Sequence, residues 1–319
     1  MTPREIMKRT IEFNSPERMA LNLPDPYTDD MIWVSMDKDP DRRHSKGTDE
    51  WGCVWDNIGV CRLGEVKDYP LKTWDDFDKM SIPDIKDQSR WTTINKFDKS
   101  ETDKFVLSSI MSLYERCHFL RGLENLWADL YENPDEVKHL LNILTEMNLY
   151  AIEKYAEAGS DGIIFCDDWG LQNTLMISPN QWREFFKPCY AREFKKAHEH
   201  GLKVFMHSCG YILEILGDLV EIGLDVAQLD QQLNMGLDEL GKYKGKLTFW
   251  CPVDIQAVMP TNNIPLIRDY TNKMVTALSD RPRGGFIGKI YADPDAVGHS
   301  KEAVDEMCKE FEKISKNWK

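Results

Sequence analysis

A histidine and a cysteine two residues apart, His207 and Cys209, end the short apolar run VFMHSCG. Side chains alternate along a β-strand, so residues i and i+2 at the end of a strand face the same way. Imidazole nitrogen and thiolate sulfur are both good zinc ligands, and the pair therefore predicts a metal site at the exit of a buried strand. The same spacing also fits a core histidine beside a small apolar thiol. Two ligands do not complete a zinc site, so a metal site needs further ligands from elsewhere in the chain.

Strand-like and helix-like segments alternate from residue 105 onward. The predicted strands are 105–110, 161–166, 202–207, 224–230, 246–251 and 284–291, and helical patterns follow each of them, the last over 300–316. Strict alternation with short connections is typical of parallel βαβ units. Six such units are readable after residue 100.

Two more strands from the first hundred residues would complete an α/β fold of the (β/α)₈ TIM-barrel type; an open doubly wound sheet is the alternative. The segment MIWVS, residues 31–35, is one candidate strand. We expect residues 1–100 to form an irregular N-terminal extension that covers the barrel mouth and supplies the first strands. Residues 101–319 would form the main body of a single domain. No GxGxxG or P-loop pattern stands at a strand-to-helix turn, which argues against a nucleotide site.

Polar or metal-binding side chains follow the predicted strands at their carboxyl ends, where the βα loops of parallel α/β folds meet. They are Asp167 and Asp168 after IIFC, His207 and Cys209, Gln228 and Asp230 in AQLD, and Cys251 after TFW. His207, Cys209 and Cys251 make a Cys₂His set that leaves zinc a fourth position. Two thiolates favour zinc over magnesium or calcium.

The carboxylates near this set have two interpretations each. Asp230 is either a fourth zinc ligand or a carboxylate that caps a helix or holds the histidine tautomer. One of Asp167 and Asp168 is a buried acid or base near the metal, or the two form an Asx-turn with a surface charge. Asp167, Asp168 and Asp230 are therefore the candidate catalytic residues.

Further polar residues at the strand ends are candidates for lining the pocket or binding a cofactor. They are Gln172 in CDDWGLQ, Gln228, and Tyr291 at the end of the last strand beside Lys289. The first hundred residues add Trp33, Trp51, Trp55, Trp74 and Trp91, which either wall an apolar pocket or anchor loops by packing.

Composition excludes some classes of partner. The formal net charge of −14 argues against nucleic acid, whose phosphates require a basic face. The first residues lack an apolar signal core and no window has the roughly 18 apolar residues of a membrane span, so we expect a cytoplasmic protein without a membrane partner. Eight cysteines without a secretory segment are then expected to be reduced thiols. Cys53 and Cys61, eight residues apart, match no tight metal motif.

Four motifs together resemble the uroporphyrinogen decarboxylase-like superfamily, and within it the corrinoid-dependent methyltransferases. They are LRGLENLWADLYENPDEV, SDGIIFCDDWGLQNTLMISPNQWREFFKPCY, HEHGLKVFMHSCGYI and LDVAQLDQ. The resemblance covers residues 100–319 and, more loosely, DEWGCVW. It implies a (β/α)₈ barrel, in agreement with the periodicity.

The branch of this superfamily decides the implied function. The true decarboxylases are metal-free and carry an arginine-rich N-terminal motif, and residues 1–60 show no such motif. The methyltransferase branch binds zinc through His-x-Cys, matched by His207 and Cys209, and a distant cysteine. Members that methylate a thiol place that cysteine after the last strand. The corresponding segment of this chain, GKIYADPDAVG, contains no cysteine, and Cys251, one strand earlier, is the only replacement at a strand end.

The absence of a cysteine after the last strand favours the branch that removes a methyl group from a donor, such as the aryl-ether O-demethylase methyltransferases. The resemblance then implies Zn²⁺ as a cofactor, a methoxylated aromatic or similar small methyl donor, and the Co(I) of a cobalamin carried by a separate corrinoid protein as the acceptor. The alternatives are a methylcobamide:thiol methyltransferase of the coenzyme M type and a metal-free decarboxylase. A non-catalytic barrel that binds a ligand or a corrinoid protein is a third. The oligomeric state stays open, with a homodimer as one option.

Overall fold

The computed structural model describes residues 1–57 and 64–319, and Cys61 lies outside the described residues. The strands are β1 (Ala20–Asn22), β2 (Met31–Trp33), β3 (Gly47–Thr48), β4 (Val54–Asn57), β5 (Gly64–Asp68), β6 (Phe105–Ser109), β7 (Gly162–Cys166), β8 (Lys203–His207), β9 (Val226–Gln228), β10 (Thr248–Cys251) and β11 (Phe286–Lys289). The α-helices are α1 (Pro3–Ile11), α2 (Thr92–Lys96), α3 (Tyr114–Arg121), α4 (Leu123–Glu132), α5 (Pro134–Glu157), α6 (Pro179–Gln181), α7 (Lys187–Glu199), α8 (Leu213–Glu221), α9 (Leu237–Gly241), α10 (Ile264–Leu278) and α11 (Lys301–Lys316).

Eight strands form one parallel sheet in the order β1-β11-β10-β9-β8-β7-β6-β2. Its two edges meet near Asp30, whose backbone N–H donates to the Leu21 carbonyl over 2.8 Å, while its carboxylate accepts from the Leu21 N–H over 2.9 Å. The near-closed sheet confirms the predicted TIM-barrel fold. The six strands predicted after residue 100 are all present, and β2 lies within the predicted segment 31–35. The eighth strand, β1, is one that the sequence did not predict.

Apolar side chains fill the interior of the barrel, as expected for a packed (β/α)₈ core. The strands contribute Ala20, Met31, Phe105, Leu107, Ile164, Phe205, Val226, Trp250 and Ile287 to this cluster. Ile6, Met7 and Ile11 of α1 join it. The Thr10 carbonyl of α1 accepts a hydrogen bond from Gly285, just before β11, so α1 closes the end of the barrel at which the strands begin.

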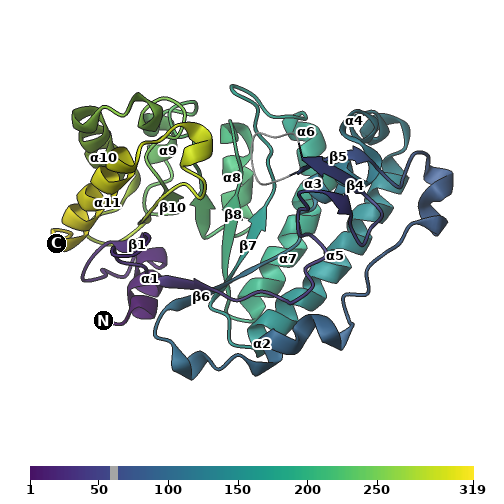
Figure 1. Ribbon diagram of the computed structural model, residues 1–319, viewed down its shortest axis with the longest axis horizontal. Helices are drawn as coiled ribbons and strands as arrows, with labels where there is room; N and C mark the ends of the chain where they lie inside the picture. Colours follow the sequence, from purple (N-terminus) through teal and green to yellow (C-terminus); the bar gives the residue numbers. More distant parts are fainter. Residues whose placement is uncertain (58–63) are drawn as a thin grey trace.

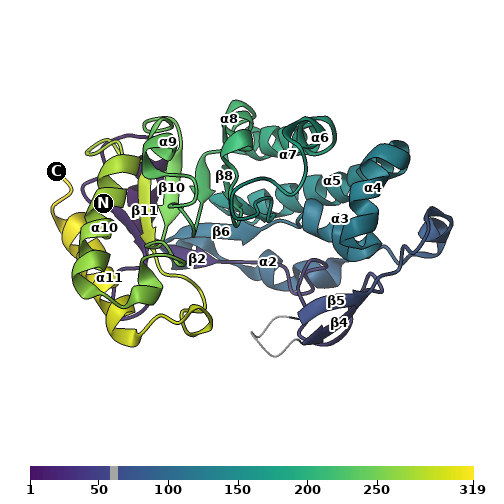
Figure 2. The same ribbon diagram turned by 90° about the horizontal axis from the view of Figure 1, so that it is seen from above.

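Helices surround the sheet, with α5 and α7 packed together on one side and α10 and α11 on the other (Figure 1). The antiparallel strands β3, β4 and β5 form a small separate sheet. Figures 1 and 2 show β4 and β5 beside α3, far from α10 and α11. The ring of Trp55 in β4 packs edge-on against Phe119 in α3, with centroids 4.9 Å apart. Among the described residues, no helix combines the length and the apolar character needed to cross a bilayer.

Candidate metal centre at the barrel mouth

The carboxyl ends of the strands present a ring of polar and aromatic side chains. Each member stands two residues after an interior apolar residue on the same strand, so strand alternation turns it toward the inside of the barrel mouth. The members are Asn22, Trp33, Ser109, Cys166, His207, Gln228 and Lys289. This is the end at which TIM-barrel enzymes carry their active sites.

Three potential ligand atoms converge at one point of this ring. They belong to Asp168, His207 and Cys209, and all lie within 4.8 Å of one another. His207 Nε2 is 3.4 Å from Cys209 Sγ and 3.3 Å from Asp168 Oδ1. Tetrahedral zinc with Zn–N near 2.0 Å and Zn–S near 2.3 Å needs ligand atoms about 3.3–3.7 Å apart. The group therefore fits a zinc ion and leaves it a fourth position.

Two touching βα loops bring the three residues together. The Gly170 N–H donates to the Cys209 carbonyl over 3.1 Å, and the Cys209 N–H donates to Asp168 Oδ1 over 2.8 Å. A Cβ on Gly210 would lie 2.2 Å from the Gly170 carbonyl oxygen, and Gly210 has a φ of +74°. Only glycines permit this approach, which explains the glycine in both CDDWG and HSCG.

The electrostatics of the group suit a cation. Burial lowers the pKa of His207, but Asp168 and Cys209 outweigh it and the net shift is upward. Burial by itself raises the pKa of Asp168. His207 and the Cys209 N–H lower this pKa by more than burial raises it, so the net shift is downward and the carboxylate stays ionised. Burial raises the pKa of Cys209. A divalent ion would displace the protons of the imidazole and the thiol, since metal ligands must be deprotonated. His207 Nδ1 is buried and lacks a hydrogen-bond partner among the described residues.

Cys251, the third ligand expected from the sequence, is not part of this group. The neighbouring Trp250 belongs to the interior cluster of the barrel, whereas Cys251 and Phe249 pack in the layer between the strands and the helices. Strand alternation therefore turns the Cys251 thiol away from the mouth. Burial raises its pKa to about 12, as expected for a packed thiol. The three side chains that converge are Asp168, His207 and Cys209, whereas the set expected from the sequence was His207, Cys209 and Cys251.

Asp167 and Asp168 point to different surroundings. The Asp167 carboxylate is buried and accepts from the backbone N–H groups of Leu113 and Glu115 over 2.8 and 2.9 Å, and from the Tyr190 hydroxyl over 2.6 Å. It thus satisfies the first N–H groups of α3. Neither aspartate is the surface charge of the Asx-turn interpretation.

The remaining predicted residues lie on the other side of the mouth. Gln228 donates to Asp230 Oδ1 over 2.7 Å, and Lys289 Nζ lies 3.5 Å from the same oxygen. Tyr291, two residues after β11, is half-buried, and burial raises its pKa. Gln172 is exposed, and it donates to Gln256, in the loop that follows β10, over 3.2 Å.

Comparison with known proteins places the chain in a family. Residues 64–275, more than half of the chain, match the family described as uroporphyrinogen decarboxylase (URO-D). The chain belongs to the URO-D family. The matched part contains the three residues of the metal group and leaves out Trp33 and the segment before β5.

A curated relative of this URO-D family member is a uroporphyrinogen decarboxylase from Nocardia farcinica, 27% identical over 112 residues. That alignment spans 35% of the chain and only 30% of the relative. Among solved structures, a methyltransferase from Methanosarcina mazei superposes with a TM-score of 0.59 at 15% identity, covering 83% of this chain and 76% of that one. At this identity the likeness shows a shared fold.

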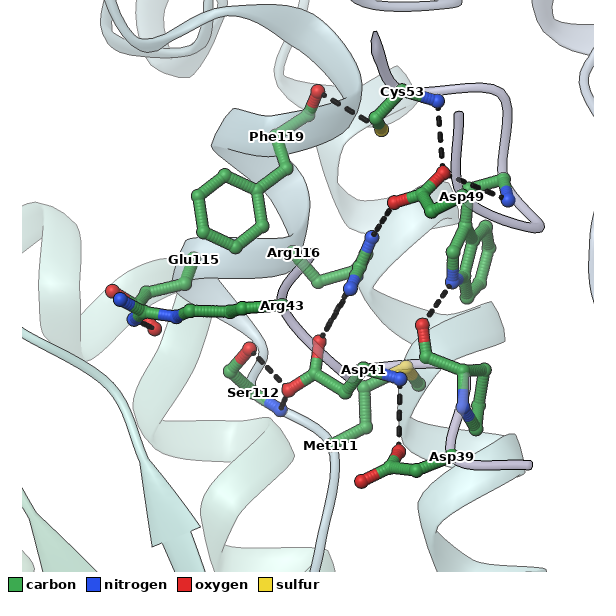
Figure 3. A network of polar contacts seen from close by, with 12 residues as sticks. Asp39, Asp41, Arg43, Asp49, Cys53, Met111, Ser112, Glu115, Arg116 and Phe119 are labelled. Atoms are coloured by element: carbon green, nitrogen blue, oxygen red, sulfur yellow. Dashed lines mark hydrogen bonds and ion pairs between the residues drawn. The ribbon is translucent and has the colours of Figure 1, made fainter. Parts of the chain in front are cut away.

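The structure also brings together two ionisable residues that the sequence did not single out, Arg43 and Glu115 (Figure 3). The Arg43 guanidinium donates to the carboxyl group of Glu115 at the start of α3. Burial raises the pKa of Glu115 to about 8, although Arg43 opposes this shift, and the charge of Asp168 adds to it. The Glu115 N–H also donates to Asp167, the neighbour of Asp168 in the chain, over 2.9 Å, so the pair lies near the metal group. Nothing in their local sequence indicates it, because the pair joins residues 72 positions apart.

The segment that carries Arg43 is fixed to the barrel by a buried cation. Arg116 donates to Asp41 Oδ1 over 2.8 Å and to Asp49 Oδ2 over 3.1 Å, and its side chain is 0% exposed (Figure 3). Cys166 is a further residue of the mouth, paired in register with His207 and exposed. Its position as the last residue of the predicted strand IIFC was a signal that could have identified it.

Proposed function

We propose that this URO-D family member is a zinc-dependent methyltransferase that moves a methyl group from a methoxylated aromatic donor to the Co(I) of a corrinoid protein. The observation that carries the proposal is the convergence of Asp168, His207 and Cys209 at the carboxyl end of the barrel. The true decarboxylases of the superfamily that this sequence resembles are metal-free, so they would not require a set of metal ligands. The barrel shared with a protein described as a methyltransferase also supports the proposal.

The three-residue set leaves a tetrahedral ion one open position for the donor. When bound there, zinc would supply Lewis acidity at the ether oxygen. The chain itself would orient the donor through Gln228, the last residue of β9, and Tyr291, two residues after β11. Asp168 belongs to the metal set, and Asp167 already accepts three hydrogen bonds. We therefore propose that Asp230 is the acid that assists the departing ether oxygen.

The first test is the metal content of the full chain purified without added zinc. We expect about one equivalent of zinc in the unchanged protein, and its loss in His207→Ala and Cys209→Ala, because three protein ligands are the minimum for such a site. Cys251→Ala is the matched control and should keep the metal, since its thiol faces the helix layer. Less than about half an equivalent in the unchanged protein, or loss only in Cys251→Ala, contradicts the proposed site.

The second test is methyl transfer to Co(I) cobalamin from a panel of methoxyarenes, methylamines and methanol. Turnover with methoxyarenes that disappears in Cys209→Ala supports the proposal. Methylation of coenzyme M from methylcobalamin without any donor activity would instead assign the thiol-methylating branch. Decarboxylation of uroporphyrinogen by metal-free protein would assign the decarboxylase branch.

A further inference from the structure

Trp33 differs from the other tryptophans that the first hundred residues carry. Trp51, Trp55 and Trp91 are buried and Trp74 is partly buried, so these four pack within the protein. The Trp33 side chain is 48% exposed although it stands at the end of a barrel strand. Its alternation with Met31, an interior residue, directs it into the mouth. An exposed aromatic ring at this place is available to stack on a ligand.

The ring of Trp33 lies over the floor of the mouth. Its centroid is 6.3 Å from that of Trp250, and the two rings are inclined by 33°. Trp250 in turn packs at 87° on Phe205, with centroids 5.9 Å apart, and is only 2% exposed. Phe205 lies two residues before His207 on β8. The aromatic floor therefore runs from β2 across the barrel to the strand that carries the metal group.

The strand register places this floor at the level of the metal group. His207 pairs with Gln228, and Gln228 pairs with Trp250. In the order of the sheet, Trp33 stands on the edge strand β2, with β6 and β7 between it and β8. A flat molecule resting on Trp33 would thus lie at the same end of the barrel as the group formed by Asp168, His207 and Cys209.

Lys289 adds a positive charge at the same floor. Its ammonium nitrogen lies 5.2 Å from the centroid of the Trp250 ring, and its side chain is 12% exposed. Among the described residues, the one hydrogen-bond partner of this ammonium group is Asp230, at the long distance of 3.5 Å. An ammonium group has three N–H donors, so two remain for a ligand. A carboxylate is the acceptor that pairs most strongly with such a cation.

We propose that Trp33, Trp250 and Lys289 form a binding site for a planar aromatic carboxylate. The ring of the ligand would stack on Trp33, and its carboxylate would accept from Lys289. The proposal rests on the proposed function, since it narrows the methyl donor to a methoxylated benzoate-type acid whose methoxy group faces the metal group. It does not depend on turnover, because the binding residues lie outside that group.

The experiment measures binding of 3-methoxybenzoate to the full chain, by calorimetry and by quenching of tryptophan fluorescence, with zinc bound and after chelation. Methoxybenzene provides the ring without the carboxylate, and cyclohexanecarboxylate provides the carboxylate without the planar ring. We expect 3-methoxybenzoate to bind more tightly than either in both metal states. Retention after chelation separates this site from direct coordination of the carboxylate by zinc.

Four variants test the assignment. Trp33→Leu should weaken 3-methoxybenzoate and methoxybenzene roughly tenfold, whereas Trp33→Phe, which keeps a ring, should stay within about threefold. Lys289→Met should weaken the acid but not methoxybenzene. Tyr131→Leu removes an aromatic side chain that is 74% exposed on α4 and should change nothing.

Three results would overturn the site. They are equal binding by Trp33→Leu and the unchanged protein, equal affinity for cyclohexanecarboxylate and 3-methoxybenzoate, and no aromatic binding at all. Circular dichroism establishes that each variant is folded before its affinity is compared. Binding that persists without any methyl transfer would refute the proposed function and leave the aromatic site standing.

Discussion

Replacing Arg116 with methionine should strongly destabilise the protein. Arg116 lies between Asp41 and Asp49, whose side chains are 16% and 2% exposed, so the substitution leaves two carboxylates without their cation. Removing one partner of a buried ion pair costs about 3–5 kcal/mol. Asp41 keeps its hydrogen bonds from Ser112, and Asp49 keeps those from Trp51, Cys53 and Trp55, which satisfy much of the stranded charge. We therefore expect the lower end of the range, about 3 kcal/mol.

Urea unfolding followed by circular dichroism measures this change in the free energy of unfolding. Arg183→Met is the matched control, because Arg183 also pairs with an aspartate, Asp218, but its side chain is 43% exposed. Exposed pairs contribute about 1 kcal/mol or less, so the control should stay close to the unchanged protein. If Arg116→Met loses no more stability than Arg183→Met, the argument that this cation holds residues 39–53 on α3 is wrong.

Three further predictions concern single side chains. Gly170→Ala places a Cβ 2.2 Å from the Tyr211 nitrogen, so it should separate the two loops and weaken zinc binding roughly tenfold in competition with a chelator; unchanged affinity would refute the role of the loop contact. Burial by itself raises the pKa of Asp161, but Lys99, the Val106 N–H and Lys8 outweigh burial and the net shift is downward. The contribution of this carboxylate to the stability of the fold is therefore present above pH ~4 and disappears as the pH falls. Asp161→Asn should lower the free energy of unfolding by about 2–3 kcal/mol at pH 7 and by less at pH 3. Glu115 has a pKa raised by burial to about 8, so it binds its proton more tightly in the folded state and stability should fall between pH 5 and pH 8; in Glu115→Gln urea unfolding should show a flatter profile over this interval.

Periodicity was sufficient to predict the barrel, because six strands and their helices repeat the same pattern and parallel strands require it. It was insufficient for β1. That strand has only three residues, Ala20–Asn22, and its pairing with β11 depends on residues more than 260 positions away. No local pattern predicts a contact of that range.

Prediction of the metal group from the sequence was limited in a similar way, here for a single residue. His207 and Cys209 were predicted as ligands from their spacing, whereas Asp168 was predicted from its place after a strand as a candidate acid or base near the metal. Cys251 was chosen because it is the last residue of its strand, but the direction of a side chain depends on its parity with interior residues such as Trp250. Apolar residues occupy both faces of a buried parallel strand, so the sequence does not show which face is inward.

The contact between Gly170 and Gly210 has an implication for how this scaffold can diversify. Because Asp168, His207 and Cys209 all come from two consecutive βα units, they form a self-contained unit, while Trp33 and Arg43 belong to a stretch that precedes it in the chain. Selection for a new small molecule can therefore remodel the early segment without disturbing these three residues. Grafting the first hundred residues of a relative onto this unit would be a direct route to altered selectivity.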